Sequence, residues 1–108
     1  MEMREIGTTG VKVSVLGLGG APLGGNFVDL DDNQAAAVAS EAISSGLTYF
    51  DTAPLYGHGL CEKRLGKVLS KIPRDEFVIS SKVGYSIVNA GFGRRHPLMN
   101  DNEGKGFI

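Results

Sequence analysis

The sequence lacks what several classes of protein require. Its 108 residues carry a formal net charge of -1, which excludes the strongly basic surface of a nucleic-acid-binding or anionic-membrane-binding protein. No apolar run approaches the roughly 20 residues that span a bilayer, and the opening MEMREIGTTG has no signal-peptide core. We therefore expect a cytoplasmic protein with no nucleic-acid and no membrane partner.

Cysteine is nearly absent. Cys61 is the single cysteine, so no disulfide can form within the chain. A lone thiol is typical of a reducing compartment. We expect Cys61 to be a small buried packing residue, because His58 is the only nearby residue that could act as its base. We predict no metal site.

Glycine is abundant instead, with 16 residues that gather at predicted turns. The apolar periodicity fades near the end of the chain, and we expect 86–108 to be a polar loop or tail. Arg94, Arg95 and His96 lie in this stretch and are expected to be solvated loop residues.

Apolar periodicity predicts strands that alternate with helices. Residues 4–15 predict a hairpin, because apolar and polar residues alternate on both sides of a glycine-containing turn. A buried strand over 16–18 leads into a long loop. A helix then runs from a cap at Asp31 or Asp32 to Gly46. Its apolar stripe contains Ala35, Val38, Ala39, Ala42 and Ile43.

The second half of the chain continues this alternation. Residues 47–51, LTYFD, predict a parallel strand buried on both faces, since the run is apolar except at its end. A helix over 61–71 carries Gly66, which predicts close packing because glycine costs about 1 kcal/mol relative to alanine there. Residues 76–84 predict a third strand. The apolar face of the helix consists of Leu65, Val68, Leu69 and Ile72.

A hairpin followed by β-α-β-α-β indicates a parallel sheet, either open and doubly wound or closed into an eight-stranded barrel. The open dinucleotide-binding sheet requires Gly-x-Gly-x-x-Gly, but GLGGAP places Pro22 at the third glycine. A typical barrel has about 250 residues in eight units, or about 31 per unit. Lys82 follows Asp51 by 31 residues, so the two would occupy equivalent positions on adjacent strands. The barrel is therefore favoured.

Asp51, Tyr56 and Lys82 form the candidate catalytic group. The carboxylate and the ammonium can pair at neighbouring strand ends in a partly dry site, and Tyr56 lies on the loop that leaves the same end. A free phenol titrates near pH 10, but an ammonium about 4 Å away stabilises a phenolate by roughly 4 kcal/mol at an effective dielectric of 20. Such a phenol can exchange a proton with a carbonyl or alcohol oxygen. The residues alone leave a structural ion pair and a packing tyrosine open.

Three stretches, LGLGGAPLGG, YFDTAPLYGHGLCEKRLGKVL and FVISSKVG, resemble the aldo-keto reductases. They are most similar to the bacterial aldose dehydrogenase branch, which includes L-fucose, D-threo-aldose and pyridoxal 4-dehydrogenases. The resemblance covers residues 4 to about 85. It implies an α/β fold, an N-terminal β-hairpin plus the first three β/α units of a (β/α)8 TIM barrel, with 1–108 as an incomplete part of that single domain.

The resemblance also implies an activity and its residues. The activity would be NAD- or NADP-dependent oxidation of an aldose, such as L-fucose or D-arabinose, or reduction of an aldehyde. Tyr56 would be the acid–base, Lys82 would adjust its acidity and Asp51 would hold the lysine. Gly20 and Ala21 would lie near the nicotinamide, and Asp51 near its ribose.

Two features of that family have no counterpart among the predicted elements. The family histidine ends a fourth strand, and neither His58 nor His96 occupies that position. Phosphate sites of such barrels come largely from the loops after strands 7 and 8. We therefore expect the 108 residues to be inactive alone. The alternative is a non-catalytic binding or assembly module that self-associates through its open sheet edges.

Overall fold

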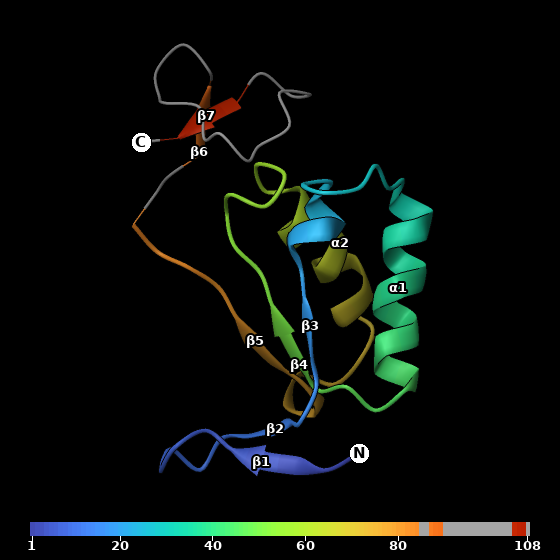
Figure 1. Cartoon of the computed structure of the whole chain (residues 1–108), viewed down its shortest axis with the longest axis vertical. Helices are drawn as coiled ribbons and strands as arrows, with labels where there is room; N and C mark the ends of the chain where they lie inside the picture. Colours follow the sequence, from blue (N-terminus) through green and yellow to red (C-terminus); the bar gives the residue numbers. More distant parts are fainter. Residues whose placement is uncertain (85–86, 90–104, 108) are drawn as a thin grey trace.

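The computed structural model describes residues 1–84, 87–89 and 105–107. Their main unit is a three-stranded parallel sheet in the order β3-β4-β5, with both helices on one face of it (Figure 1). The predicted β-α-β-α-β order is confirmed, although the described residues do not close into a barrel. The elements are β3 (Gly17–Gly19), α1 (Asp32–Ser44), β4 (Tyr49–Asp51), α2 (Leu60–Leu69) and β5 (Val78–Ser80).

The predicted hairpin is present at the amino ends of these strands (Figure 1). Strand β1 (Met3–Glu5) pairs antiparallel with β2 (Lys12–Ser14). The backbone N–H of Ser14 donates to Thr48 Oγ1, and the N–H of Thr48 donates to Ser14 Oγ, both at 2.9 Å. This reciprocal pair fixes the hairpin against the start of β4.

Short elements complete the described chain. The 3-10 turns are η1 (Ala21–Gly24) and η2 (Arg74–Glu76). Strands β6 (Ile87–Asn89) and β7 (Lys105–Phe107) pair antiparallel within the stretch expected to be a polar loop or tail. Most of that stretch lies outside the described residues, as do Arg94, Arg95 and His96.

The hydrophobic core lies between the sheet and the two helices. Phe50 points into it and is fully buried, whereas its neighbours Tyr49 and Asp51 are only half-buried. The expectation that this strand is buried on both faces is therefore wrong, because the helices cover one face only. Val38 is also 42% exposed, at the edge of the α1 stripe. The other buried apolar residues of the core are Leu23, Ala35, Ala39, Ala42, Cys61, Leu65, Val68 and Leu69.

Local signals set the helix ends. Asp31 caps α1 by accepting from the N–H of Gln34, and the Gln34 side chain accepts from the N–H of Asp31 in a reciprocal capping box. After α1, Gly46 has a φ of 88°, the left-handed conformation that favours glycine. The α2 segment stops before Pro73, which disfavours helix in the residue before it.

Gly66 does not have the packing role predicted for it. A Cβ at this position would meet no atom within 4 Å, and the residue is exposed in the middle of α2. Gly66→Ala is therefore expected to raise the free energy of unfolding by about 0.5–1 kcal/mol, because alanine loses less backbone entropy in a helix. Urea denaturation measures the change. A destabilised Gly66→Ala variant would contradict the open surroundings seen here.

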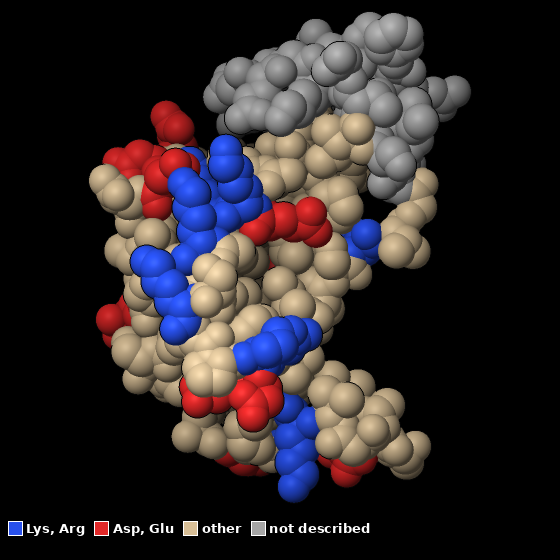
Figure 2. Space-filling model, turned by 180° about the vertical axis from the view of Figure 1, so that it is seen from behind, with Lys and Arg blue, Asp and Glu red and all other residues tan. Residues whose placement is uncertain are grey.

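Charged side chains of opposite sign lie close together on the surface. Figure 2 shows Lys and Arg beside Asp and Glu on the face turned away in Figure 1. Asp32 is paired with Arg64 at 2.8 Å and with Lys67 at 3.7 Å. Within the described ranges, no helix combines the length and the apolar character that a membrane span needs.

Candidate active site

Asp51, Tyr56 and Lys82 come together at the carboxyl ends of the parallel strands. Asp51 is the last residue of β4, and Tyr56 lies in the turn that follows it. Lys82 Nζ donates to Asp51 Oδ2 at 2.9 Å and to the Thr52 carbonyl at 2.9 Å. The same ammonium lies 4.8 Å from the centroid of the Tyr56 ring. The expected ion pair forms, and the phenol is its neighbour.

The register corrects one detail of the prediction. Asp51 pairs with Ser80 across β4 and β5, and Lys82 lies two residues further along. Two residues of extended chain span about 6.6 Å, so the long lysine side chain reaches back to the carboxylate. Ser80, rather than Lys82, occupies the position equivalent to Asp51.

The ion pair is less dry than expected. The side chain of Lys82 is 50% exposed and that of Asp51 is 38% exposed. Burial raises the pKa of Asp51, but hydrogen bonds from Ser80 and Lys82 and the lysine charge outweigh it, so the pKa lies below its usual 3.8. Burial lowers the pKa of Lys82, whereas interactions with Asp51 and Tyr56 raise it above its usual 10.5. Both groups are therefore charged at neutral pH.

These shifts predict how stability depends on pH. A carboxyl with a lowered folded-state pKa stabilises the fold above its ordinary pKa and loses that effect as the pH falls through the folded value. Conversely, the raised pKa of Lys82 gives a contribution that is present below 10.5 and lost as the pH rises through the folded value. We expect Asp51→Asn to be most destabilising between these limits.

Denaturation at a series of pH values tests this expectation. The difference between wild type and Asp51→Asn should shrink below about pH 4, where the carboxyl becomes neutral like asparagine. It should also shrink at alkaline pH, and this second decrease should disappear in a Lys82→Met background. A difference that does not change with pH would contradict the pairing.

The loop between β3 and α1 is packed directly on the Tyr56 turn. A Cβ on Gly24 would lie 2.5 Å from the Tyr56 carbonyl carbon and 2.8 Å from Gly57 N. Gly57 has a φ of 63°, and its N–H donates to Asn26 Oδ1 at 3.0 Å. The backbone of Gly24 lies directly against the backbone of Tyr56 and Gly57. The β3–α1 loop therefore fixes the position of the turn that carries Tyr56.

Arg64 holds this loop from the other side. Its side chain is only 9% exposed, and Nη1 and Nη2 donate to the carbonyls of Leu23 and Leu30 at 2.7 and 2.9 Å. Its Nε donates to Asp32 Oδ1 at 2.8 Å. Arg64 was not among the residues predicted to matter. A signal was available, since position 64 follows Cys61 by three residues and so falls on the buried stripe of α2.

Gly20 and Ala21 lie next to Asp51. The N–H of Gly20 donates to the Asp51 carbonyl at 2.8 Å. A Cβ on Gly20 would lie 2.6 Å from both that carbonyl oxygen and Cys61 Sγ. Packing therefore requires a glycine here, independently of any ligand. Ala21 begins η1 and is half-buried.

Cys61 and His58 are both buried near the tyrosine turn. Cys61 is fully buried and accepts a hydrogen bond from Thr52 Oγ1 at 3.1 Å. Burial raises the pKa of the Cys61 thiol, which agrees with the expected packing role. His58 is 4% exposed and has a φ of 54°. Among the described residues, no group of three or more histidine, cysteine or acidic side chains could hold a metal ion.

Comparison with known proteins gives a consistent result. A family model described as "Aldo/keto reductase family" matches residues 15–105. The chain is 45% identical over 96 residues to pyridoxal 4-dehydrogenase of Microbacterium luteolum, covering 89% of this chain and 28% of that protein. It is 51% identical over 75 residues to D-threo-aldose 1-dehydrogenase of a Pseudomonas species, covering 69% of this chain and 23% of the relative.

The same family appears among solved structures. An aldo-keto reductase from Bacillus halodurans, solved in its holo form, is 37% identical with a TM-score of 0.68. The match covers 78% of this chain and 26% of that structure. The chain therefore spans only about a quarter of the length of the proteins it matches.

Proposed function

The chain belongs to the aldo/keto reductase family, and we propose that the whole protein is an NAD(P)-dependent aldose dehydrogenase or aldehyde reductase. The observation that carries this proposal is the group at the strand ends, a phenol beside an ammonium that a carboxylate holds. An aldose substrate is favoured because one similar protein is named a D-threo-aldose 1-dehydrogenase. L-fucose and D-arabinose are the first sugars to test.

In this proposal the three side chains have separate tasks. Tyr56 gives a proton to the carbonyl oxygen during reduction and takes one from the alcohol during oxidation. The ammonium of Lys82 stabilises the phenolate that remains when the proton has left. Asp51 holds the ammonium in place through a 2.9 Å hydrogen bond. The bound nicotinamide supplies or accepts the hydride.

Asp51 has the capacity to bind part of that cofactor. An ionised carboxylate offers about four lone-pair sites, and Ser80 and Lys82 donate one hydrogen bond each to its two oxygens. The remaining sites can accept from a hydroxyl such as those of a ribose. We propose that Asp51, with Gly20 and Ala21 beside it, binds the nicotinamide ribose end of NAD or NADP.

We propose that the 108 residues alone do not turn over substrate and that 1–108 belongs to one larger barrel domain. In such barrels the phosphates bind at the loops after strands 7 and 8, whereas three parallel strands are described here. The single buried Cys61 is consistent with a cytoplasmic setting, which is part of the same proposal.

The proposal is tested by assaying the complete protein and the 108-residue chain in parallel. For oxidation, each is mixed with NAD⁺ or NADP⁺ and with L-fucose or D-arabinose. For reduction, each is mixed with the reduced cofactor and a simple aldehyde. We expect turnover from the complete protein only. A complete protein that binds the cofactor but oxidises no aldose and reduces no aldehyde would refute the proposed activity.

Self-association of the 108-residue chain is a second candidate property. In the described part of the chain, β3 and β5 are the edges of the parallel sheet. Leu16 and Val83, which flank these edges, are 61% and 97% exposed, and unpaired edges promote association between chains. Size-exclusion chromatography with mass measurement tests whether the chain associates. A cooperatively folding monomer would count against association through the edges.

A further inference from the structure

Two hydroxyl groups continue the hydrogen bonds of the Asp51–Lys82 pair on the side away from Tyr56. Ser80 Oγ donates to Asp51 Oδ1 at 2.6 Å, and the Tyr49 hydroxyl lies 3.0 Å from Ser80 Oγ. Serine has a single hydroxyl proton. Since Ser80 gives that proton to the carboxylate, Tyr49 must be the donor in its contact with Ser80. The hydrogen bonds therefore run in one direction, from Tyr49 through Ser80 to Asp51.

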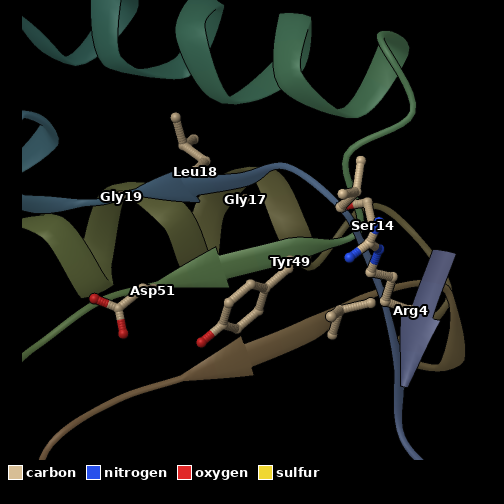
Figure 3. Close-up of a pocket in the computed structure, with 9 residues that line it drawn as sticks. Arg4, Ser14, Gly17, Leu18, Gly19, Tyr49 and Asp51 are labelled. Atoms are coloured by element: carbon tan, nitrogen blue, oxygen red, sulfur yellow. The ribbon is translucent and has the colours of Figure 1, made fainter. Parts of the chain in front are cut away.

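Strand geometry brings these side chains together. Tyr49 and Asp51 are two residues apart on β4, so both project from the same face of the sheet. Figure 3 shows them on the side opposite Leu18, which points toward the helices. The β4–β5 register places Ser80 beside Asp51. This face borders a groove of about 450 Å³ lined by Tyr49, Asp51 and the β3 backbone.

We propose that Ser80, itself oriented by Tyr49, is a positioning residue for the Asp51 carboxylate and thereby for the Lys82 ammonium beside Tyr56. This inference rests on the proposed function. The carboxylate is bound at both oxygens, with Ser80 on Oδ1 and Lys82 on Oδ2. A carboxylate held in this way cannot rotate about its Cβ–Cγ bond without losing a bond. The lysine therefore meets an acceptor of fixed direction, as precise active sites require.

The charged surroundings of Asp51 agree with this role. Lys82 from the end of β5 is the cation that pairs with Asp51, and the Tyr56 ring lies beyond that lysine. Arg4 of β1 is a second cation that lines the groove on this face of the sheet. Burial raises the pKa of Asp51 and the hydrogen bond from Ser80 is the largest influence that lowers it. Removing that hydroxyl therefore acts directly on the carboxylate.

The decisive variants are Ser80→Ala, which removes the hydroxyl, and Ser80→Thr, which keeps one. Ser81→Ala is the matched control, because the next hydroxyl in the chain donates to Glu62 instead. In the complete protein we expect Ser80→Ala to lower kcat about three- to tenfold, within the range of an ordinary hydrogen bond and less than the full effect of a bond to a charged group, because Ser80 acts on the reaction only through Asp51. Ser80→Thr should restore kcat, and Ser81→Ala should leave it unchanged.

A double-variant comparison tests the contribution of Tyr49. Tyr49→Phe keeps the ring and removes only the hydroxyl, so it should lower kcat in the wild-type background. The same change should have no effect on kcat in the Ser80→Ala background, since Tyr49 acts through Ser80. An equal loss in both backgrounds would show that Tyr49 acts independently of Ser80, and would overturn this part of the proposal.

A titration of the Asp51 carboxyl by carbon-13 NMR supplies a readout that does not depend on turnover. We expect a higher pKa in Ser80→Ala than in wild type, Ser80→Thr or Ser81→Ala. An unchanged titration in Ser80→Ala would overturn the positioning role, whatever the enzyme does. If the titration shifts as expected while Tyr56→Phe keeps full turnover, the positioning of Asp51 stands and the proposed catalytic function fails.

Discussion

Replacing Tyr56 with phenylalanine is expected to lower the kcat of the complete protein about 10²- to 10⁴-fold, the range that general acid–base catalysis contributes. The phenylalanine ring keeps the packing of the turn and the 4.8 Å contact with the Lys82 ammonium. It has no hydroxyl to give or take the proton. Binding of the cofactor should change little, because the substitution removes one oxygen from a turn that backbone contacts hold.

The rate of cofactor reduction in the presence of an aldose measures the loss of kcat. A calorimetric titration measures cofactor binding. Tyr49→Phe is the matched comparison, since it removes the same group from a nearby tyrosine and should cost much less. Lys82→Met should also slow the reaction, because the phenolate loses its positive neighbour. Tyr56→Phe with more than about a tenth of wild-type turnover would place the acid–base elsewhere.

Arg64→Met is expected to give the largest loss of stability, about 2–4 kcal/mol in the free energy of unfolding. Methionine fills much of the same space but donates no hydrogen bond. The carbonyls of Leu23 and Leu30 would lose their 2.7 and 2.9 Å partners, and an unsatisfied buried acceptor carries a full desolvation cost. The loop between β3 and α1 would then lose its hydrogen bonds to α2 and keep only its apolar packing.

Urea denaturation of wild type and variant gives this value directly. Arg74→Met is the matched control, because Arg74 is exposed and donates a single hydrogen bond to the Phe77 carbonyl. Arg74→Met should change the free energy of unfolding by no more than about 0.5 kcal/mol, as most surface substitutions do. Asp32→Asn should also cost less than Arg64→Met, since Asp32 is exposed. An Arg64→Met variant as stable as Arg74→Met would show that the two carbonyls find other partners.

Sequence patterns predicted the parts of this fold that depend on neighbours along the chain. The order of strands and helices, the cap at Asp31 and the stop at Gly46 follow from local conformational preferences. The pairing of Asp51 with Lys82 also followed, because the 31-residue spacing matches one unit of a barrel. Local rules and a unit length were sufficient for these features.

The features that were missed depend on contacts between distant segments. The spacing did not reveal that Ser80, rather than Lys82, lies beside Asp51, since register is fixed by the whole sheet. Strand alternation could have placed Tyr49 on the face of Asp51. Gly66 resembled a packing glycine, but the close approaches occur at other glycines, and those at Gly24 and Gly57 are contacts between loops. The periodicity of apolar residues in a sequence carries no information about contacts between loops.

The backbone contact between Gly24 and Gly57 has a consequence for how this protein can change. It leaves no room for a side chain, so neither residue can vary without displacing the tyrosine turn. Phe27 and Val28, a few residues further along the same loop, are 72% and 47% exposed. Substitutions there can alter the chemistry of the loop while the contact stays intact. Mutagenesis libraries that vary the surface of this loop should therefore randomise 27–29 and keep both glycines.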